Sequence, residues 1–378
     1  MGRTRLLTVA DRLEAMGGAE IAQVSVMEGL AAAGWTIDLL YVTKGDLWPR
    51  WNALAAGTRA VRSSQLRREA PLRSAWGSLD GFAGLMRTST DVVYLHNPGD
   101  LPVALSAARL KRVPVVVHLH LPPPHHQPAW LNRLIARADA VIAPSADAAR
   151  RWIRAAGLAD DRVSVIPTGV DTGRFVPLTE SERMDQRRAL GIDPAAPVLL
   201  YAGRLNPTKG LSVLLESVRR MEEPVALVVC GSAVDAAYAE GLHRESQGLD
   251  VTWVDRGVDI APLMAASDLV VLPSEVPETQ GMVVSEAMAC GTPAVATAVG
   301  GVPETLSGFP GHLVPPGDAT ALAGVVDHLI RWRRHTPSLG SDSRRWVLAR
   351  KFEGLDLCVR VVLSLLLEPV VQQLALGC

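Results

Sequence analysis

Short apolar segments rich in β-branched residues recur along the chain and alternate with stretches of helical periodicity. Their hydrophobicity is continuous rather than alternating, which is typical of strands buried on both faces of a parallel sheet. One intervening stretch, residues 19–33, places Ile21, Val24, Met27 and Leu30 at helical spacing. In the first half the predicted strands are RLLTVA (5–10), TIDLLYVT (36–43), DVVYLHN (91–97), VPVVVHLHL (113–121), DAVIAPS (139–145) and RVSVIPTG (162–169).

The same pattern starts again after residue 190. The predicted strands there are PVLLYAG (197–203), VALVVCG (225–231), DVTWVD (250–255), SDLVVLPS (267–274), TPAVATAVG (292–300) and GHLVPPG (311–317). We therefore predict an α/β protein with two Rossmann-like, doubly wound parallel-sheet domains, in which ligands bind beyond the carboxyl ends of the strands. The predicted domains are residues 1–178 and 179–355, joined near 175–185, with a C-terminal helix over 356–378 packing back on the first domain.

Length and charge narrow the class of protein. A chain of 378 residues suits two domains of about 150–200 residues each. The net charge of −1 predicts no nucleic-acid partner. Lys and Arg nevertheless exceed Asp and Glu in residues 1–180, and much of this excess lies in TRAVRSSQLRREAPLR (58–73). That stretch is either a solvated face or a patch for an anionic acceptor or a membrane surface.

The cysteines and the ends of the chain bear on localisation. Cys230 and Cys290 lie in apolar runs and none of the four cysteines forms a CxxC pair, which favours a reducing compartment. The first residues do not fit a signal peptide, and the apolar run 361–377 is broken by Glu368 and Pro369. We expect a cytoplasmic protein, soluble or in peripheral contact with a membrane.

The segment PSEVPETQGMVVSEAMACGTPAVAT (273–297) follows a predicted strand and carries two glutamates. Glu278 lies just before the predicted helix MVVSEAMAC, and Glu286 lies about one turn inside it. An unpaired buried carboxylate is costly, and hydroxyls of a sugar or a ribose would offset that cost; a helix-dipole glutamate open to solvent is the alternative. The N–H groups that would be free at the positive helix end, suited to phosphate, are those of Gly281, Met282 and Val283.

Two glycine-containing loops also follow predicted strands. In YAGRLNPTKGLSVLLESV (201–218), Arg204 and Lys209 flank a loop in which Gly203 and Gly210 allow close backbone approach, and two cations at a helix start suit a diphosphate. The alternative is a solvated Arg and Lys. In AMGGAEIAQ (15–23), Gly17 and Gly18 would let the backbone meet a pyrophosphate, or form a plain turn.

Histidines gather at two strand ends. His118 and His120 share one face of VVVHLHLPPPHH (115–126), and His96 follows another strand. Contact with substrate is the favoured interpretation for the histidines of this strand, whereas for His96 a packed or capping histidine is favoured over a position near the substrate. Because no Cys or carboxylate joins them, we expect no metal site.

Several segments match a known family. IPTGVDTGRFVP (166–177), YAGRLNPTKG (201–210), DLVVLPSEVPETQGMVVSEAMACGTPAVATAVGG (268–301) and HLVPPGD (312–318) resemble the retaining, nucleotide-sugar-dependent glycosyltransferases of family four. The resemblance runs in order over about residues 5–355. It implies the glycosyltransferase-B architecture, with the two domains facing each other across a cleft.

The resemblance also implies roles for individual residues. Glu278 would hold hydroxyls of the donor sugar, Glu286 the nucleotide ribose, and the N–H groups of Gly281, Met282 and Val283 the sugar and diphosphate.

For the remaining motifs, the resemblance implies that Arg204 and Lys209 neutralise the diphosphate, that Gly17 and Gly18 approach it from the other domain, and that His120 lies beside donor sugar and acceptor. It also implies that no metal or cofactor and no covalent intermediate is needed, with the leaving phosphate taking the acceptor's proton.

Two departures leave the sugar and base pockets open. Gln280 stands where many members carry an aromatic residue, and CGSAVDAAYAE (230–240) replaces a glycine-rich turn. The leading hypothesis is transfer from a UDP- or GDP-sugar to a hydroxyl; a sugar-nucleotide epimerase and an idle sugar-nucleotide-binding module are the alternatives. A lipid or phosphorylated acceptor suits the positive half, and an aminocyclitol or other natural product fits equally. A cationic acceptor would need an acidic cluster, for which Asp11 and Asp100 are candidates.

Overall fold

The computed structural model describes residues 4–15, 17–65, 71–124, 126–233, 235–255 and 257–350, together with Cys358, Val361 and Ser364. Two compact units divide the chain. The first comprises Met1–Gly169 and Glu353–Cys378, and the second Val170–Phe352. The sequence-based division at residue 178 differs from this one because Val170 and Phe175 pack into the core of the second unit.

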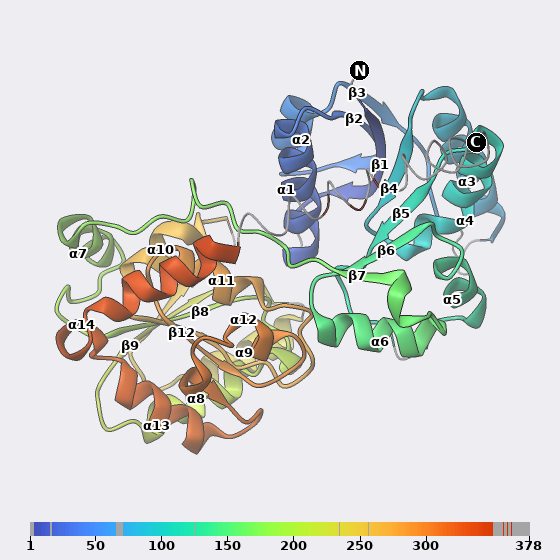
Figure 1. Ribbon diagram of the computed structural model, residues 1–378. Coiled ribbons are helices and arrows are strands. Elements are labelled where there is room, and N and C mark those ends of the chain that lie inside the picture. Colours follow the sequence, from blue (N-terminus) through green and yellow to red (C-terminus); the bar gives the residue numbers. More distant parts are fainter. Residues whose placement is uncertain are drawn as a thin grey trace, which may run out of the picture. The chain divides into compact units, whose positions relative to one another are not determined.

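The first unit contains a parallel sheet of seven strands in the order β3-β2-β1-β4-β5-β6-β7 (Figure 1). The strands are β1 (Arg5–Leu13), β2 (Thr36–Lys44), β3 (Gly57–Ala60), β4 (Val92–Leu95), β5 (Val115–His118), β6 (Ala140–Ala143) and β7 (Val163–Val165). The helices are α1 (Gly18–Ala32), α2 (Trp48–Leu54), α3 (Pro71–Arg87), α4 (Leu101–Lys111), α5 (Ala129–Ile135) and α6 (Ala146–Ala156), with short 3₁₀ turns at Pro98–Asp100 and Asp160–Arg162.

Apolar side chains cover both faces of this sheet, as its continuous hydrophobic strands predict. Along β1, Leu7 and Val9 belong to one buried cluster, while Leu6 and Ala10 belong to another on the opposite face. The second cluster contains Val24, Met27 and Leu30 of α1. The helical periodicity of residues 19–33 is therefore explained by burial of one face of α1 against the sheet.

The second unit contains a parallel sheet of six strands in the order β10-β9-β8-β11-β12-β13. The strands are β8 (Val198–Ala202), β9 (Ala226–Cys230), β10 (Val251–Val254), β11 (Leu269–Leu272), β12 (Ala294–Thr297) and β13 (Leu313–Val314). The helices are α7 (Glu180–Ala189), α8 (Leu211–Arg220), α9 (Ala236–Glu245), α10 (Ile260–Ala266), α11 (Met282–Ala289), α12 (Val302–Thr305), α13 (Ala319–Leu329) and α14 (Trp332–His335), with 3₁₀ turns at Pro207–Lys209 and Pro310–His312.

The two strand orders confirm the predicted fold class of two doubly wound α/β domains. In each sheet the order reverses once, between β1 and β4 in the first unit and between β8 and β11 in the second. Such reversal points leave a crevice at the carboxyl ends of the two strands, where open α/β sheets bind ligands. The topology therefore marks two places for a site, one in each unit.

A buried ionic cluster fastens α7 to the second sheet. Asp268, whose side chain is 8 % exposed, lies 2.8 Å from Arg187, 3.1 Å from Arg333 and 3.5 Å from Arg183. Its Oδ2 also accepts a hydrogen bond from the backbone N–H of Val198, where β8 begins. We call these four charged residues the Asp268 cluster. It ties the charged segment that follows residue 175 to the core of the second unit.

Most of the predicted C-terminal helix over 356–378 lies outside the described residues. Cys358 is buried, and both Cys358 and Val361 pack into the apolar cluster around Tyr94 and Val116 of the first unit. The tail thus returns to the first unit at these two positions. Among the described residues, the helices are all too short or too polar to cross a bilayer.

Candidate functional site

The loop after β11 leads into α11 through a glycine that the local packing requires. Gly281 has a φ of +78°, and a Cβ placed there would lie 3.0 Å from Val302 and 3.1 Å from Leu272. A residue with a side chain would be strained by the left-handed backbone conformation and would also press against the packed neighbours. Met282 and Val283 form the first turn of α11, so their N–H groups lie at its positive end, as predicted.

Glu278 is held at the end of this loop by two polar side chains. Lys209 Nζ lies 2.5 Å from Glu278 Oε1, and the hydroxyl of Ser274 lies 2.5 Å from the same oxygen. The backbone carbonyl of Glu278 accepts from the N–H of Gly301 at 2.8 Å. Gly300, with a φ of +58°, would bring a Cβ to 2.0 Å from that carbonyl oxygen. Tight packing therefore fixes the position of the carboxylate.

The loop after β8 supplies the two predicted cations. Lys209 ends the 3₁₀ turn and reaches Glu278, whereas the Arg204 side chain is exposed. The buried Tyr201 donates its hydroxyl to the carbonyl of Arg204 at 2.9 Å, which fixes the backbone there. Gly210 has a φ of +68°, and its Cβ would lie 1.9 Å from the carbonyl oxygen of Pro273. The two loops thus meet by direct backbone contact beyond β8 and β11, at the point where the strand order of the sheet reverses.

Glu286 lies half-buried on α11. Desolvation raises the pKa of Glu286 to about 7, and the positive charge of Arg174 opposes that rise. Arg174 is itself paired with Asp259 at 2.7 Å. The neighbours of Glu286 in the sequence are apolar, but the fold places the Arg174 guanidinium close enough to act electrostatically on its carboxyl group. A carboxylate poised near neutral pH is typical of a functional site, although ion-pair networks shift pKa values too.

The structure adds site residues that the sequence analysis assigned no role. Ser274 binds Glu278, and Arg174 acts on Glu286. Arg174 lies in the quoted motif IPTGVDTGRFVP, and Ser274 ends LVVLPS, which echoes AVIAPS at 140–145. In the similar segment 140–145 of the first unit, the corresponding serine is Ser145, which caps the start of α6 instead. Both segments therefore end in a serine, but Ser274 contacts a carboxylate and Ser145 a helix N-terminus.

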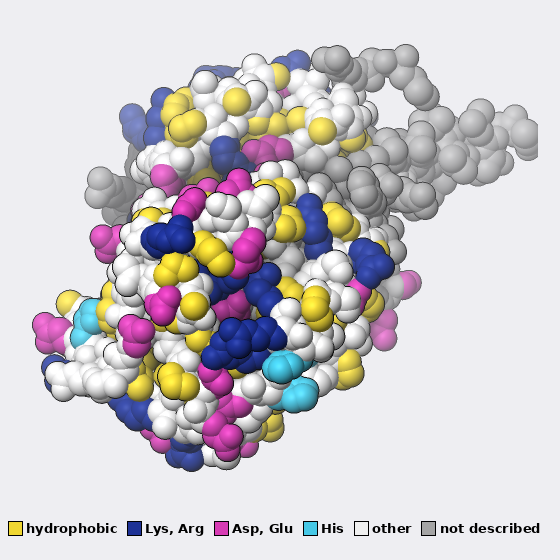
Figure 2. All heavy atoms as spheres, turned by 90° about the vertical axis from the view of Figure 1, so that its left-hand side faces the viewer, with side chains coloured by type: hydrophobic (Ala, Val, Ile, Leu, Met, Phe, Trp, Pro, Cys, Tyr) yellow, Lys and Arg dark blue, Asp and Glu magenta, His cyan; other side chains and the backbone are white. Residues whose placement is uncertain are grey.

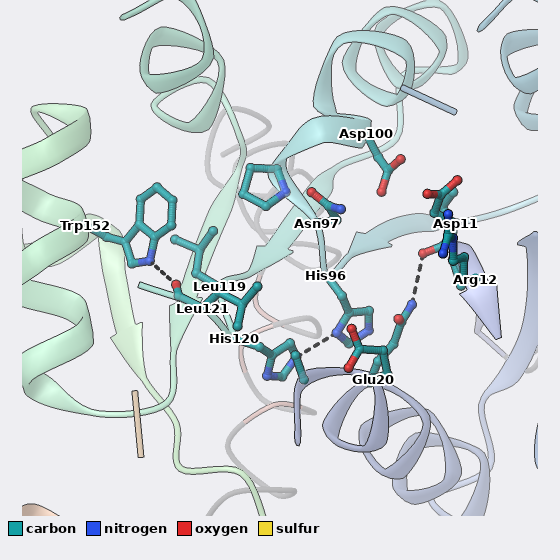
Figure 3. Close-up of a pocket in the computed structure, with 15 residues that line it drawn as sticks. Asp11, Arg12, Glu20, His96, Asn97, Asp100, Leu119, His120, Leu121 and Trp152 are labelled. Carbon is teal, nitrogen blue, oxygen red and sulfur yellow. Dashed lines mark hydrogen bonds between the residues drawn. The ribbon is translucent and has the colours of Figure 1, made fainter. Parts of the chain in front are cut away.

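The first unit holds a cavity of about 380 Å³ at the carboxyl ends of β1, β4 and β5 (Figure 3). His96 and His120 face each other in it, with His96 Nδ1 2.8 Å from His120 Nε2. The start of α1 contributes Glu20 and Gln23, and Gln23 donates to the carbonyl of Val9 at 2.9 Å. The other lining residues are Val9, Ala10, Asp11, Arg12, Ala19, Asn97, Pro98, Asp100, Leu119, Leu121 and Trp152.

Three carboxylates line this cavity. Asp11 and Asp100, the two candidates from the sequence, both contribute to it, together with Glu20, which the sequence analysis did not name. Asp100 is buried and accepts a hydrogen bond from Ser64 at 2.6 Å. Arg12 is the cation in the same lining. Asp100 lies far from Asp11 and Glu20 in the sequence, and the three residues meet because β1 ends, and α1 and the turn after β4 begin, at the same edge of the sheet.

The three predicted histidines lie together, and burial makes them weak bases. Burial lowers the pKa of His120 to about 3. It also lowers the pKa of His96 and of His118 well below the usual range, and the positive charges of their histidine neighbours would lower both further. His118 Nδ1 lies 3.0 Å from the hydroxyl of Tyr94, behind the residues that line the cavity. All three imidazoles are therefore uncharged near neutral pH.

The predicted glycine pair stands where α1 begins. Gly18 is the first residue of α1, and Gly17 precedes it with an extended backbone at φ −176°. A Cβ on Gly17 would make only an ordinary contact, 3.7 Å from Glu20 Oε2. Local packing therefore does not require a glycine at residue 17, and its role as a pyrophosphate contact stays a prediction.

Charged side chains of both signs are interspersed on the face shown in Figure 2, among apolar and uncharged ones. The basic stretch 58–73 is described only in part. Its first residues belong to β3, an edge strand that the sequence analysis did not predict. Residues 66–70 and the side chains of 71–76 lie outside the described part of the chain, so the predicted patch stays a prediction.

Two family models match the chain. One described as Glycosyltransferase Family 4 matches residues 16–174, and one described as Glycosyl transferases group 1 matches residues 196–331. D-inositol 3-phosphate glycosyltransferase of Xylanimonas cellulosilytica is 32 % identical over 287 residues, which are 67 % of this chain and 69 % of that protein. Sulfoquinovosyl transferase SQD2 of Arabidopsis thaliana is 29 % identical over 279 residues, 69 % of this chain and 54 % of that one.

Solved structures share the fold over nearly the whole length. Anabaena HepE in complex with UDP and glucose has a TM-score of 0.79 at 24 % identity, covering 99 % of this chain and 100 % of that one. Sucrose-phosphate synthase from Thermosynechococcus elongatus has a TM-score of 0.76 at 22 % identity, covering 100 % of both chains. The two doubly wound domains, the ordered motifs and these matches lead to one conclusion: the chain belongs to glycosyltransferase family 4.

Proposed function

We propose that this chain is a retaining glycosyltransferase that moves a sugar from a nucleotide diphosphate sugar, with UDP-sugars as the first candidates, to a hydroxyl of an acceptor. One observation carries the proposal: Lys209, Glu278 and Ser274 are joined at the reversal point of the second sheet, beside the start of α11. A carboxylate, a cation and free N–H groups at that position suit a sugar attached to a diphosphate.

Each group of the second unit has a physical task in this proposal. Glu278 accepts hydrogen bonds from hydroxyls of the donor sugar, and Glu286 from the ribose. Lys209, the exposed Arg204 and the N–H groups of Met282 and Val283 stabilise negative charge on the diphosphate. That charge grows as the bond between sugar and phosphate breaks, so groups fixed beforehand lower the barrier most.

The first unit is proposed to bind the acceptor. Its cavity is lined by the uncharged imidazoles of His120 and His96, and the acidic residues suit a polyhydroxylated molecule. The leaving phosphate is proposed to take the acceptor's proton, which gives retention without a covalent intermediate. A divalent cation on the diphosphate is not required, because the donor loops already supply cations and N–H donors.

The proposed donor draws support from known structures. HepE, which shares the fold, was solved with UDP and glucose and also with UDP-glucose. The acceptor is proposed to be a small molecule, a natural product such as an aminocyclitol, a lipid or a saccharide. Cys230, Cys290 and Cys358 are buried free thiols, which supports the proposed reducing, cytoplasmic location, with soluble or peripheral behaviour.

The experiment follows each product of the reaction. UDP-glucose, UDP-N-acetylglucosamine and GDP-mannose are each incubated with the protein and a panel of polyol acceptors, with and without Mg²⁺ or Mn²⁺. We expect acceptor-dependent release of nucleotide, unchanged by either cation, and an NMR coupling constant showing that the anomeric configuration is kept. Glu278→Gln should abolish release.

Other products would favour the alternatives. A changed sugar nucleotide formed without acceptor would indicate an epimerase, and binding without any turnover would indicate an idle module. A product with inverted configuration would contradict retention.

A further inference from the structure

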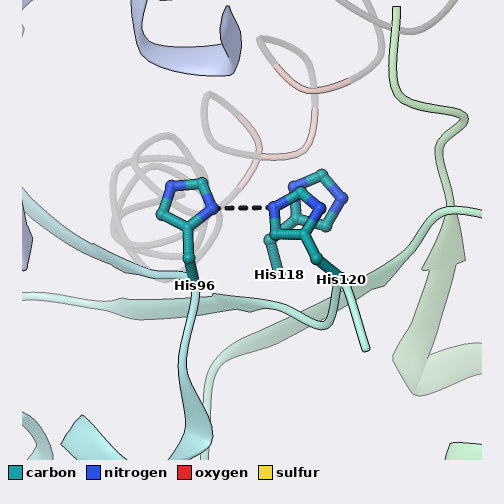
Figure 4. A group of neighbouring side chains, drawn as sticks. All are labelled: His96, His118 and His120. Carbon is teal, nitrogen blue, oxygen red and sulfur yellow. Dashed lines mark hydrogen bonds between the residues drawn. The ribbon is translucent and has the colours of Figure 1, made fainter. Parts of the chain in front are cut away.

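The strand register of the first unit brings three imidazoles together. In the parallel pair β4 and β5, Leu95 is opposite Val117, so His96 at the end of β4 is next to His118. His120 follows two residues later on the same side. Figure 4 shows the three rings gathered at one point. One ring nitrogen from each lies within 4.8 Å of the others, the only such group of histidine, cysteine or carboxylate side chains among the residues described.

Two ring nitrogens of this cluster have no hydrogen-bond partner in the described structure. The Nε2 atoms of His96 and His118 are both shielded from solvent and unsatisfied. His118 itself is 1 % exposed, and its other nitrogen, Nδ1, is held 3.0 Å from the hydroxyl of Tyr94. Buried polar atoms are nearly always paired, so the unsatisfied Nε2 of His118, which lies beside the two other imidazoles, points to a ligand that completes the cluster.

The sequence predicts no metal site at these histidines; from their arrangement in the structure we propose instead that His96, His118 and His120 bind a transition-metal cation, with Zn²⁺ as the first candidate. Imidazole nitrogens are preferred ligands of zinc, and three histidines with one open position are a known type of zinc site. Tyr94 acts as an outer partner: when the Nδ1–H of His118 donates to the hydroxyl oxygen of Tyr94, the ring is oriented and Nε2 is left unprotonated as the ligand. The three rings are already uncharged, the form that binds metal.

Only small side-chain movements separate this arrangement from coordination. Ring nitrogens bound to one zinc ion at about 2.0–2.1 Å lie roughly 3.3 Å apart in tetrahedral geometry. His96 Nδ1 and His120 Nε2 are 2.8 Å apart and would separate slightly, while His118 Nε2 would approach. The ring centroids of His118 and His120 are 4.0 Å apart, and coordination requires these side chains to rotate until the Nε2 atoms of both point at the ion.

The open position of the ion would face the cavity. His96 and His120 line the cavity, and His118 lies behind them. Water or an oxygen atom of a bound molecule would supply the fourth ligand. The ion is held by residues of the first unit alone and is not a cation on the donor diphosphate. Because it would occupy His120, zinc is expected to inhibit any reaction that uses this histidine, but binding itself does not depend on the proposed function.

The test measures zinc binding to the intact, chelator-treated protein by competition with a chromophoric chelator. We expect one tight site in the wild type, weakened at least tenfold in His118→Gln and in His96→Gln. Tyr94→Phe removes only the hydroxyl and should weaken binding by roughly 10–100-fold. His312→Gln is the control, because His312 is another buried histidine, bound to the carbonyl of Ala294 in the second unit. It should bind zinc like the wild type.

Co²⁺ in place of Zn²⁺ identifies the ligands. We expect the visible bands of a tetrahedral nitrogen and oxygen site, without a thiolate charge-transfer band. A folded wild type that binds no zinc would overturn the proposal. Equal affinity in the wild type, His118→Gln and Tyr94→Phe would overturn it as well, as would thiolate bands, because the ion would then lie elsewhere. Circular dichroism of each variant shows whether a loss of binding reflects a loss of folding.

Discussion

Lys209 Nζ lies 2.5 Å from Glu278 Oε1, which joins two motifs that are 69 positions apart in the chain. Both side chains are mostly buried, with 21 % and 16 % of their surface exposed. The pair links the loop after β8 to the loop after β11 at the reversal of the second sheet. The proposed donor site is thus held together by its own charged residues.

A double-mutant cycle measures the interaction energy between Lys209 and Glu278. Lys209→Met and Glu278→Gln should each lower the free energy of unfolding by about 1–2 kcal/mol, because each leaves a mostly buried group without its partner. The double variant should lose about 1 kcal/mol less than the sum, as measured by urea denaturation. The exposed pair Glu216 and Arg220 on α8 serves as control, with a coupling of about 0.3–0.5 kcal/mol. Strict additivity at Lys209 and Glu278 would show that the pair is not formed in solution.

The pKa of Glu286 predicts a pH-dependent stability. The folded state holds a proton on Glu286 up to about pH 7, whereas the unfolded chain loses it near 4.5. The folded state therefore binds more protons at Glu286 in this window, and the contribution of Glu286 to the free energy of unfolding falls as the pH rises through it. The Glu286→Gln variant has no carboxyl group at this position and lacks this pH-dependent loss of stability. Its stability relative to the wild type should increase between pH 4 and pH 8 by up to about 3 kcal/mol. A difference that stays constant over this range would contradict the shifted pKa.

Gly210 is predicted to be irreplaceable. Its positive φ and the 1.9 Å approach of a Cβ to Pro273 mean that Gly210→Ala strains the backbone and separates the two donor loops. We expect a loss of more than about 2 kcal/mol in unfolding free energy, with weaker nucleotide binding. Gly241→Ala is the matched control: Gly241 lies within α9, and nothing is within 4 Å of its Cβ position. That change should stabilise by about 0.5–1 kcal/mol. Similar effects of both changes would refute the close approach.

The Asp268 cluster predicts a large loss in a single variant. Asp268→Asn leaves buried guanidinium groups without their counter-charge and should cost about 3 kcal/mol, measured by thermal or urea unfolding. Asp185→Asn breaks an ion pair with Arg188 in which both side chains are well exposed, so it should change stability by less than about 0.5 kcal/mol. Equal losses would mean that the cluster contributes no more than a surface pair.

Much of the fold could be predicted from the sequence because burial on both faces leaves a continuous apolar signature. The exception is β3, where Gly57–Ala60 contains Thr58 and Arg59 and has no apolar run. It lies at the edge of the sheet beside β2, and an edge strand does not need to be apolar. Its pairing with β2, rather than its own composition, makes it a strand.

The candidate site was only partly predictable. Gly281 and the helix start at Met282 follow from local sequence, but the contact between Lys209 and Glu278 depends on how two loops pack. The electrostatic effect of Arg174 on Glu286 likewise joins residues that lie far apart in the sequence. The histidines on β5 could be placed on one face, whereas the position of His96 beside them required the register of β4 against β5. Pairwise spacing along a chain carries no information on such contacts.

The central claim is that the loops after β8 and β11 bind a nucleotide diphosphate sugar. The most direct measurement is a thermal-shift screen with UDP, GDP, UDP-glucose, UDP-N-acetylglucosamine and GDP-mannose. A ligand at 100 times its dissociation constant stabilises by about 2.7 kcal/mol, which is readily seen. We predict a response to one nucleotide family that is lost in Arg204→Ala and kept in Arg188→Ala, an exposed arginine on α7. No stabilisation of the folded wild type by any of these ligands, or an unchanged response in Arg204→Ala, would contradict the account.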